Sequence, residues 1–172
     1  IIIENKKRGR GYAIIDALNF TSKPLACIAS LDNAWDRQFY KSAYNILDKS
    51  KLVFCVYGPK DHRESKQIRP ISRKIISFFS KIFLRTIFFR KLHKDTQCIK
   101  MFRVDYNFIK NLKPYNYFFD TQFFLLNYKK KLQYKNIPVK IRDNNKFSKV
   151  RISLIIQFIF ESFHYLFTND KN

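Results

Sequence analysis

Two short apolar runs, each preceded by a segment with helical spacing, constrain the fold of this 172-residue chain more than any other feature. Residues 25–32 (LACIASLD) and 51–57 (KLVFCVY) are predicted to be buried strands, because continuous apolar runs are typical of strands covered on both faces. Residues 10–20 and 36–48 carry apolar side chains three and four positions apart, which predicts helices. This helix–strand–helix–strand order predicts an α/β domain whose mainly parallel sheet is flanked by helices.

Two further helices in the chain are rich in aromatic residues. Residues 70–90 and 151–167 have amphipathic patterns. Polar residues interrupt both, so neither contains the roughly 20 consecutive apolar residues that a membrane span needs. Either they are ordinary core helices, or they lie in a membrane interface, as helices with bulky apolar faces do. The remaining predicted elements are short helices at 104–112 and 120–130 and an edge strand at 134–141, which Pro138 interrupts.

The charge of the chain favours an anionic partner. The 34 Lys and Arg residues exceed the 13 Asp and Glu residues, giving a formal net charge of +21. Such an excess suits nucleic acid, an anionic membrane surface or phosphorylated substrates, although a compositional bias toward Lys, Asn, Ile, Phe and Tyr would explain part of it. The cysteines have no CxxC spacing and the histidines no HExxH pattern, which argues against a zinc finger or a metalloprotease.

Three stretches of the sequence resemble the motifs of one enzyme family. They are residues 9–13 (GRGYA), residues 95–102 (DTQCIKMF), and residues 119–122 (FDTQ) with 137–139 (IPV) and 148–151 (SKVR). In this order they are similar to the NxGKGxA, DTQCGFKxF and FDxE–EVPV–SKVR motifs of the family 2 glycosyltransferases related to dolichyl-phosphate mannose and glucose synthases. The resemblance spans roughly residues 5–152.

The resemblance implies a fold, a reaction and a location. The expected fold is a GT-A type nucleotide-binding α/β sheet, with residues 1–150 forming a partial GT-A domain and residues 151–172 a C-terminal amphipathic helix and tail. The expected reaction transfers a hexose from a nucleotide-sugar to a polyprenyl phosphate. The expected location is cytoplasmic and peripheral at the membrane surface, without a nucleic-acid partner.

The resemblance also assigns residues to the reaction. A divalent cation, Mg or Mn, is expected at Asp32 and Asp36, because the family holds this ion with a DxD cluster and hard oxygen ligands suit both metals. The expected catalytic residues are Asp32, Asp95, Gln97 and Asp120. The expected substrate-binding residues are Gly9, Arg10, Gly11, Arg73, Ser77, Gln122, Lys149 and Arg151. Arg73 and Ser77 are four residues apart and therefore share one face of a helix.

Several departures from the family pattern leave alternatives open. Ala34 stands at the second acid of DxD, Tyr57 lies where an Arg is usual, and Gln122 replaces a Glu. The family's PxxNE and VDDGSxD stretches are missing, so we expect a chain truncated at its N-terminus. One alternative is a catalytically decayed or fragmentary relative of these enzymes. A second alternative is a basic nucleic-acid-binding module, although no RNP-like, helix-turn-helix or zinc pattern supports it.

Overall fold

The protein has an α/β fold in which helices cover a four-stranded sheet. The computed structural model describes residues 9–29, 37–60, 62–65, 71–88, 95–140 and 152–169, and of residues 71–74 and 169 it describes the backbone alone. Along the chain the elements are α1 (Arg10–Phe20), β1 (Leu25–Ile28), α2 (Arg37–Lys49), β2 (Val53–Gly58), α3 (Ile71–Ile87), β3 (Ile99–Arg103), α4 (Tyr106–Ile109), α5 (Phe119–Lys129), β4 (Gln133–Asn136) and α6 (Ile152–Asn169).

The strand order of the sheet is β1-β3-β2-β4. β3 pairs antiparallel with both β1 and β2, whereas β4 pairs parallel with β2. β1, β2 and β4 therefore run in one direction, as expected, but β3 enters between the first two and runs against them. The prediction of a mainly parallel sheet is wrong, because two of the three strand pairs are antiparallel. Both of these pairs involve β3, which comes from far along the chain and lies between β1 and β2.

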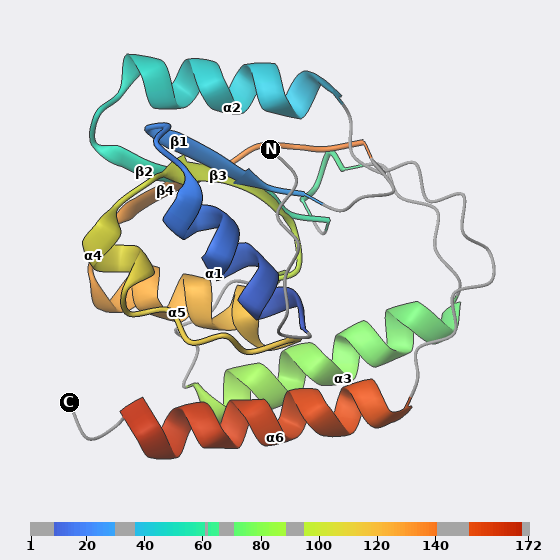
Figure 1. Cartoon of the computed structure of the whole chain (residues 1–172). Coiled ribbons are helices and arrows are strands. Elements are labelled where there is room, and N and C mark those ends of the chain that lie inside the picture. The colour runs from blue at the N-terminus through green and yellow to red at the C-terminus, as the bar shows by residue number, and fades with distance from the viewer. Residues whose placement is uncertain are drawn as a thin grey trace.

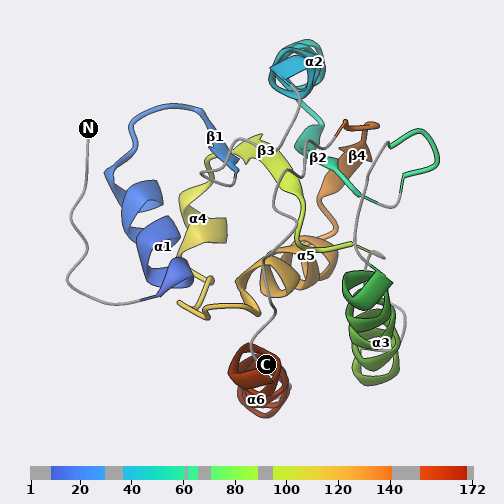
Figure 2. The ribbon, with the colours of Figure 1, turned by 90° about the vertical axis from the view of Figure 1, so that its right-hand side faces the viewer.

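The elements form stacked layers (Figures 1 and 2). α2 covers one face of the sheet, while α1, α4 and α5 lie against the other face. α3 and α6 form an outermost layer on the far side of α5. Rings of α3 and α6 meet in this layer, since Phe83 lies 6.4 Å from Phe158 and 6.1 Å from Phe163 between ring centroids.

An aromatic cluster joins the sheet to α5. Phe123 of α5 is fully buried and its ring centroid lies 4.9 Å from that of Phe102 on β3 and 5.0 Å from that of Phe108 on α4. Phe54 of β2 closes the cluster at 4.8 Å from Phe108. Edge-on and tilted rings at these separations stabilise a core beyond the area they bury. The cluster thereby fixes α5 against β2 and β3.

Most elements expected from periodicity are present. The predicted helices 10–20, 36–48, 70–90 and 151–167 correspond to α1, α2, α3 and α6, and the strands 25–32 and 51–57 correspond to β1 and β2. β4 lies at the end of the strand order, which confirms the predicted edge position. β3 was not expected, and it is the strand that contacts both β1 and β2.

α3 and α6 are the two helices of the outermost layer. Within the part of the chain that the structure describes, no helix combines the length and apolar character that a membrane span requires. Both helices nevertheless expose large apolar side chains in stripes spaced three and four residues apart. The exposed residues are Ile75, Phe78, Phe79 and Ile82 on α3, and Ile152, Ile156, Ile159, Phe160, Phe163 and Phe167 on α6.

Arg103 of β3 satisfies the carbonyl groups at the C-terminal end of α2. Its Nη2 donates to the carbonyl oxygens of Leu47 and Ser50, the latter at 3.0 Å, and its Nε donates to that of Val53 at 3.1 Å. Carbonyl groups at a helix C-terminus have no partner within the helix, and a cation there is favoured by the helix dipole. Arg103 thus connects α2, β2 and β3.

We predict that Arg103→Leu lowers the free energy of unfolding by about 1.5–3 kcal/mol, because hydrogen bonds from a charged group are lost and buried carbonyls remain. Chemical denaturation measures the change. Arg37→Leu, at the exposed start of α2, is the matched control and should change stability by less than about 0.5 kcal/mol. Equal effects of the two substitutions would contradict this role of Arg103.

Candidate functional site

The carboxyl ends of three strands meet at one edge of the sheet. Ile28 at the end of β1 pairs with Lys100, Gly58 at the end of β2 pairs with Ile99, and Tyr57 pairs with Asn136 at the end of β4. β3 begins at this edge because it runs in the opposite direction. The carboxyl edge of an α/β sheet is the usual place for a ligand.

The turn before β3 lies at this edge. Asp95 is half-buried, and its Oδ2 accepts a hydrogen bond from the backbone N–H of Lys60 at 2.7 Å, just beyond the end of β2. Gln97 is exposed. Asp95 and Gln97, two of the predicted catalytic residues, therefore lie together beside the strand ends.

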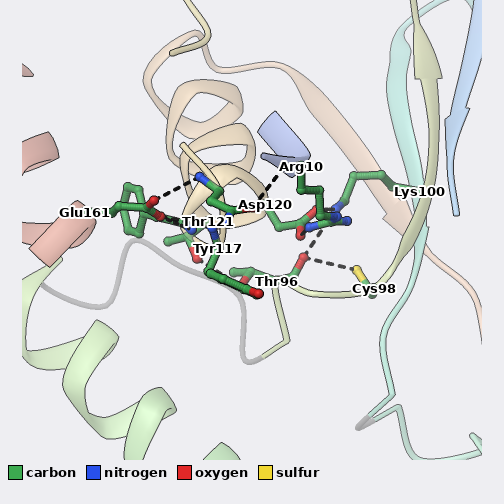
Figure 3. A network of polar contacts seen from close by, with 10 residues as sticks. Arg10, Thr96, Cys98, Lys100, Tyr117, Asp120, Thr121 and Glu161 are labelled. Atoms are coloured by element: carbon green, nitrogen blue, oxygen red, sulfur yellow. Dashed lines mark hydrogen bonds and ion pairs between the residues drawn. The ribbon is translucent and has the colours of Figure 1, made fainter. Parts of the chain in front are cut away.

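A buried ion-paired network lies between this turn and α5 (Figure 3). Asp120 is fully buried in the first turn of α5 and pairs with Lys100 of β3, which is also fully buried, and with Arg10 of α1. The Lys100 Nζ also donates to the carbonyl oxygen of Thr96 at 3.4 Å. The Thr96 hydroxyl lies 3.1 Å from that of Thr121. Thus α1, the turn before β3, and the start of α5 share one set of polar contacts.

The charges of this network set the protonation of Asp120. Burial by itself raises the pKa of a carboxyl group, yet the positive charges of Lys100 and Arg10 and their hydrogen bonds outweigh it. The pKa of Asp120 therefore lies below its ordinary value, and the residue is an anion at neutral pH. The Lys100 Nζ additionally lies 5.7 Å and 5.4 Å from the ring centroids of Phe123 and Phe124, where a cation is attracted to the ring faces.

At both glycines of the first motif, Gly9 and Gly11, the structure disfavours a residue with a side chain. Gly9 precedes α1 with φ 131°, a conformation that residues with a Cβ rarely adopt. A Cβ on Gly11 would lie 1.9 Å from the carbonyl oxygen of Tyr115. The close approach of α1 to this loop lets Arg10 reach Asp120. Both terminal nitrogens of Arg10 bond Asp120, while 42 % of its side chain remains exposed.

Gln122 and Cys98 are turned inward. The Gln122 amide, oriented to satisfy its hydrogen bonds, donates to the carbonyl oxygen of Lys113 at 2.9 Å and accepts from the Lys113 N–H at 2.7 Å. It thus holds the loop before α5. Burial raises the pKa of the Cys98 thiol well above its ordinary value although Lys100 opposes the shift. A neutral buried thiol is a poor nucleophile.

A polar hollow of about 420 Å³ lies at the ends of β2 and β4, lined by Tyr57, Tyr134, Lys135 and Asn136. The hollow is open to solvent and is not an enclosed cavity. Burial raises the pKa of Tyr57 above its ordinary value, although a side-chain hydrogen bond with Asn136 opposes this. The Tyr57 hydroxyl therefore stays protonated at neutral pH and retains a proton to donate.

The structure brings some predicted site residues together and leaves others apart. Gly9, Arg10 and Gly11 meet Asp120 and the loop before α5, and Asp95 adjoins them through Thr96. Ser77 is half-buried on α3, in the outermost layer. Arg73 belongs to the same helix, but its side chain lies outside the described residues. Asp32, Asp36, Lys149 and Arg151 also lie outside them, and so does any geometry of the predicted metal site.

The sequence analysis did not predict that Lys100 and Glu161 would bind groups from other elements. Lys100 is the single charge within the run Ile99–Phe102, and Glu161 is the single acid of α6. An isolated charge among apolar residues is a sign of a buried, paired group. Among the described residues, no group of three or more His, Cys, Asp or Glu side chains is arranged to hold a metal ion.

Comparisons with known proteins add no relative. No family model matches the chain, and no curated protein matches it in a sequence search.

We predict that Asp120→Asn lowers the free energy of unfolding by about 3–5 kcal/mol, because it leaves the buried charge of Lys100 without its partner. The depressed pKa of Asp120 contributes stability at pH values above the ordinary value of 3.8, and this contribution disappears as pH falls through the lower, folded-state pKa. The stability difference between wild type and variant should therefore shrink as the pH falls below 3.8.

Two further variants sharpen this measurement. Lys100→Met combined with Asp120→Asn should recover much of the loss, since no bare charge then remains in the core. Asp48→Asn, at an exposed position of α2, should change stability by less than about 0.5 kcal/mol. Additive effects of the two buried substitutions would show that Lys100 and Asp120 do not depend on each other.

Proposed function

We propose that the chain is a glycosyltransferase that moves a hexose from a nucleotide-sugar to a polyprenyl phosphate at a membrane surface. One observation supports the proposal above others. The three sequence stretches that resemble the family 2 glycosyltransferases are separated by up to about a hundred residues, and Arg10, Thr96, Lys100 and Asp120 from these stretches meet in one polar network. Functional motifs are expected to converge in this way, because a site draws its residues from several elements.

The position of Asp95 and Gln97 supports a role in donor binding. Both lie at the carboxyl edge of the sheet, in the same turn as Thr96, where hydroxyl groups of a sugar would find carboxylate and amide partners. The hollow beside Tyr57 and Lys135 lies at the end of the same strands. Its aromatic and cationic groups suit a nucleotide, which carries a π-system and phosphates.

The acceptor needs positive charge more than a base. A lipid phosphate is already largely anionic near neutral pH, so it acts as a nucleophile once it is bound and oriented. Arg10 keeps 42 % of its side chain exposed while both its terminal nitrogens bond Asp120, so it attracts a phosphate through its positive charge and not through a free bidentate fork. In this proposal Asp120 positions Arg10 from the core side, and Lys100 keeps Asp120 ionised.

The proposed divalent cation would be held by Asp32 and Asp36. Carboxylate oxygens suit Mg or Mn, and such an ion would neutralise the charge that develops on the departing nucleoside diphosphate. The described residues offer no alternative metal cluster, so this part of the proposal rests on those two acids alone.

The outer layer supports the membrane part of the proposal. Phe78 and Phe79 of α3 and Phe160 and Phe167 of α6 are each at least 60 % exposed. Exposed apolar stripes of this size are unusual on a free surface and suit an interface. Together with the net charge of +21, they favour an anionic lipid surface.

A second candidate is a relative of these enzymes that no longer catalyses transfer. Arg10 and Asp120 bind each other and Gln122 binds Lys113, so part of the predicted donor site is satisfied within the chain. Calorimetric titration with nucleotide-sugars and Mn distinguishes the two candidates. Metal-dependent binding favours the enzyme, whereas its absence for every donor favours the inactive relative.

We predict that the chain, mixed with vesicles containing polyprenyl phosphate, Mg or Mn, and a panel of radiolabelled nucleotide-sugars, forms a lipid-linked hexose. Asp95→Asn should reduce the rate at least about tenfold, because the amide keeps the shape but loses the charge. Asp48→Asn should leave the rate unchanged. The absence of a lipid-linked product with every donor would sink the proposed reaction.

We predict that Phe160→Glu weakens binding to anionic vesicles by about tenfold or more, because one fully inserted phenyl group contributes about 1.5–3 kcal/mol. Sedimentation with vesicles measures the bound fraction. Tyr44→Glu is the matched control, since Tyr44 is an exposed aromatic residue on α2, on the opposite side of the sheet. Equal losses for both variants would show that the effect comes from charge alone and not from insertion of α6.

A further inference from the structure

α6 turns one carboxylate toward the body of the protein. Glu161 is the only charged side chain of Ile152–Asn169, and it is half-buried. Its Oε1 accepts from the backbone N–H of Asn116 at 3.0 Å, and its Oε2 accepts from those of Tyr117 and Phe118 at 3.0 Å and 2.9 Å (Figure 3). Three consecutive backbone amides are therefore held by a side chain from a helix more than forty residues away.

These amides form the entrance to α5. Phe118 occupies the N-cap position of α5, and its own side chain makes no capping hydrogen bond. The first N–H groups of a helix have no partner within the helix, and a negative charge there is stabilised by the helix dipole. Glu161 accepts from the N-cap amide of Phe118 and from the two amides before it, so it holds the segment that leads into α5.

The same segment holds the start of α1. The Asn116 side-chain oxygen accepts from the backbone N–H of Arg10 at 2.9 Å. Two residues beyond Phe118, Asp120 binds the guanidinium of Arg10 and the ammonium of Lys100. Residues 116–118 therefore connect Glu161 to Arg10 and Asp120, and the three hydrogen bonds of Glu161 help to hold this segment in place.

The opposite face of α6 is apolar and open. Ile152, Ile156, Phe160 and Phe167 follow one another at helical spacing and are exposed, while Phe158, Tyr165 and Leu166 pack inward. The outward stripe carries no acid, and the chain as a whole carries a net charge of +21. An anionic lipid surface matches both properties, because it accepts bulky apolar side chains and attracts cations.

We propose that α6 couples lipid binding to the polar network: when its outer face inserts into an anionic lipid surface, Glu161 fixes residues 116–118 and thereby orders Arg10 and Asp120. The inference rests on the membrane contact of the proposed function and adds Glu161 as a positioning residue. Insertion of the outer face into lipid restricts the motion of a surface helix. Restricting the motion of α6 would restrict residues 116–118 through the hydrogen bonds of Glu161, and these residues in turn contact α5 and α1.

Hydrogen–deuterium exchange of the full chain tests the coupling. Exchange is followed for peptides covering residues 116–122 and the start of α1, with and without vesicles of phosphatidylcholine and phosphatidylglycerol. In the wild-type chain the vesicles should slow exchange at residues 116–122 by about tenfold. In Glu161→Gln the same vesicles should slow it by less than about threefold, although the variant binds them equally well. Glu64→Gln, at an exposed loop position, should behave as the wild type.

The difference between the two vesicle effects separates coupling from a merely structural role. A structural role alone would raise exchange in Glu161→Gln by the same factor with and without vesicles. Equal slowing in both chains, or no slowing in a wild-type chain that is bound to vesicles, would overturn the proposal. If Glu161→Gln does not fold, Phe160→Glu provides the test, since it should lose both vesicle binding and the slowing at residues 116–122.

Other outcomes are equally decisive. A wild-type chain that ignores vesicles and instead forms a dimer, measured by light scattering, would assign the outer face to a second copy and overturn the lipid partner. The transfer assay remains independent of these measurements. Vesicle-dependent slowing without any transferred hexose would refute the proposed reaction and leave the coupling intact, whereas transfer without slowing would do the reverse.

Discussion

The pairing of Lys100 with Asp120 is the interaction on which the rest of the structure depends. Both side chains are fully buried, and either charge alone would be costly to keep away from water. The pair fixes β3 against the first turn of α5, while the ring of Phe123 packs beside it against Phe102 and Phe108. Because β3 pairs with both β1 and β2, the same contact sets the position of the whole sheet relative to α5.

Local sequence patterns were sufficient to predict most helices and two strands, because their apolar residues recur at the spacing of a single element. β3 escaped prediction because Lys100 and Arg103 interrupt its apolar run, and both charges have partners that only the folded chain supplies. The antiparallel insertion of β3 depends on contacts between residues far apart in sequence. A local sequence pattern does not indicate which distant strand will pair with it. The expected parallel pairing of β1 with β2 is therefore replaced by two antiparallel pairs with β3.

The same division applies to the candidate site. Resemblance pointed to Arg10, Asp95 and Asp120, and these residues do lie in neighbouring parts of the fold. It did not indicate that Arg10 and Asp120 bind each other, nor that Gln122 would hold Lys113. Glu161 was visible only as an interruption of an apolar helix. Its three amide partners lie in a loop whose position depends on α1, α5 and α6 together, which no single segment reveals.

The exposed position of Arg10 has a consequence for local unfolding of the protein. Lys100 and Asp120 already cancel each other's charge in the core, so Arg10 is a second cation that adds to a neutral pair. If α1 were to swing away, its guanidinium would move into water and the pair left behind would still be balanced. Removing β3 or α5, in contrast, would strand a lone ion in an apolar interior. α1 can therefore separate from the rest of the fold without leaving an unpaired ion in the core, which is not true of β3 or α5.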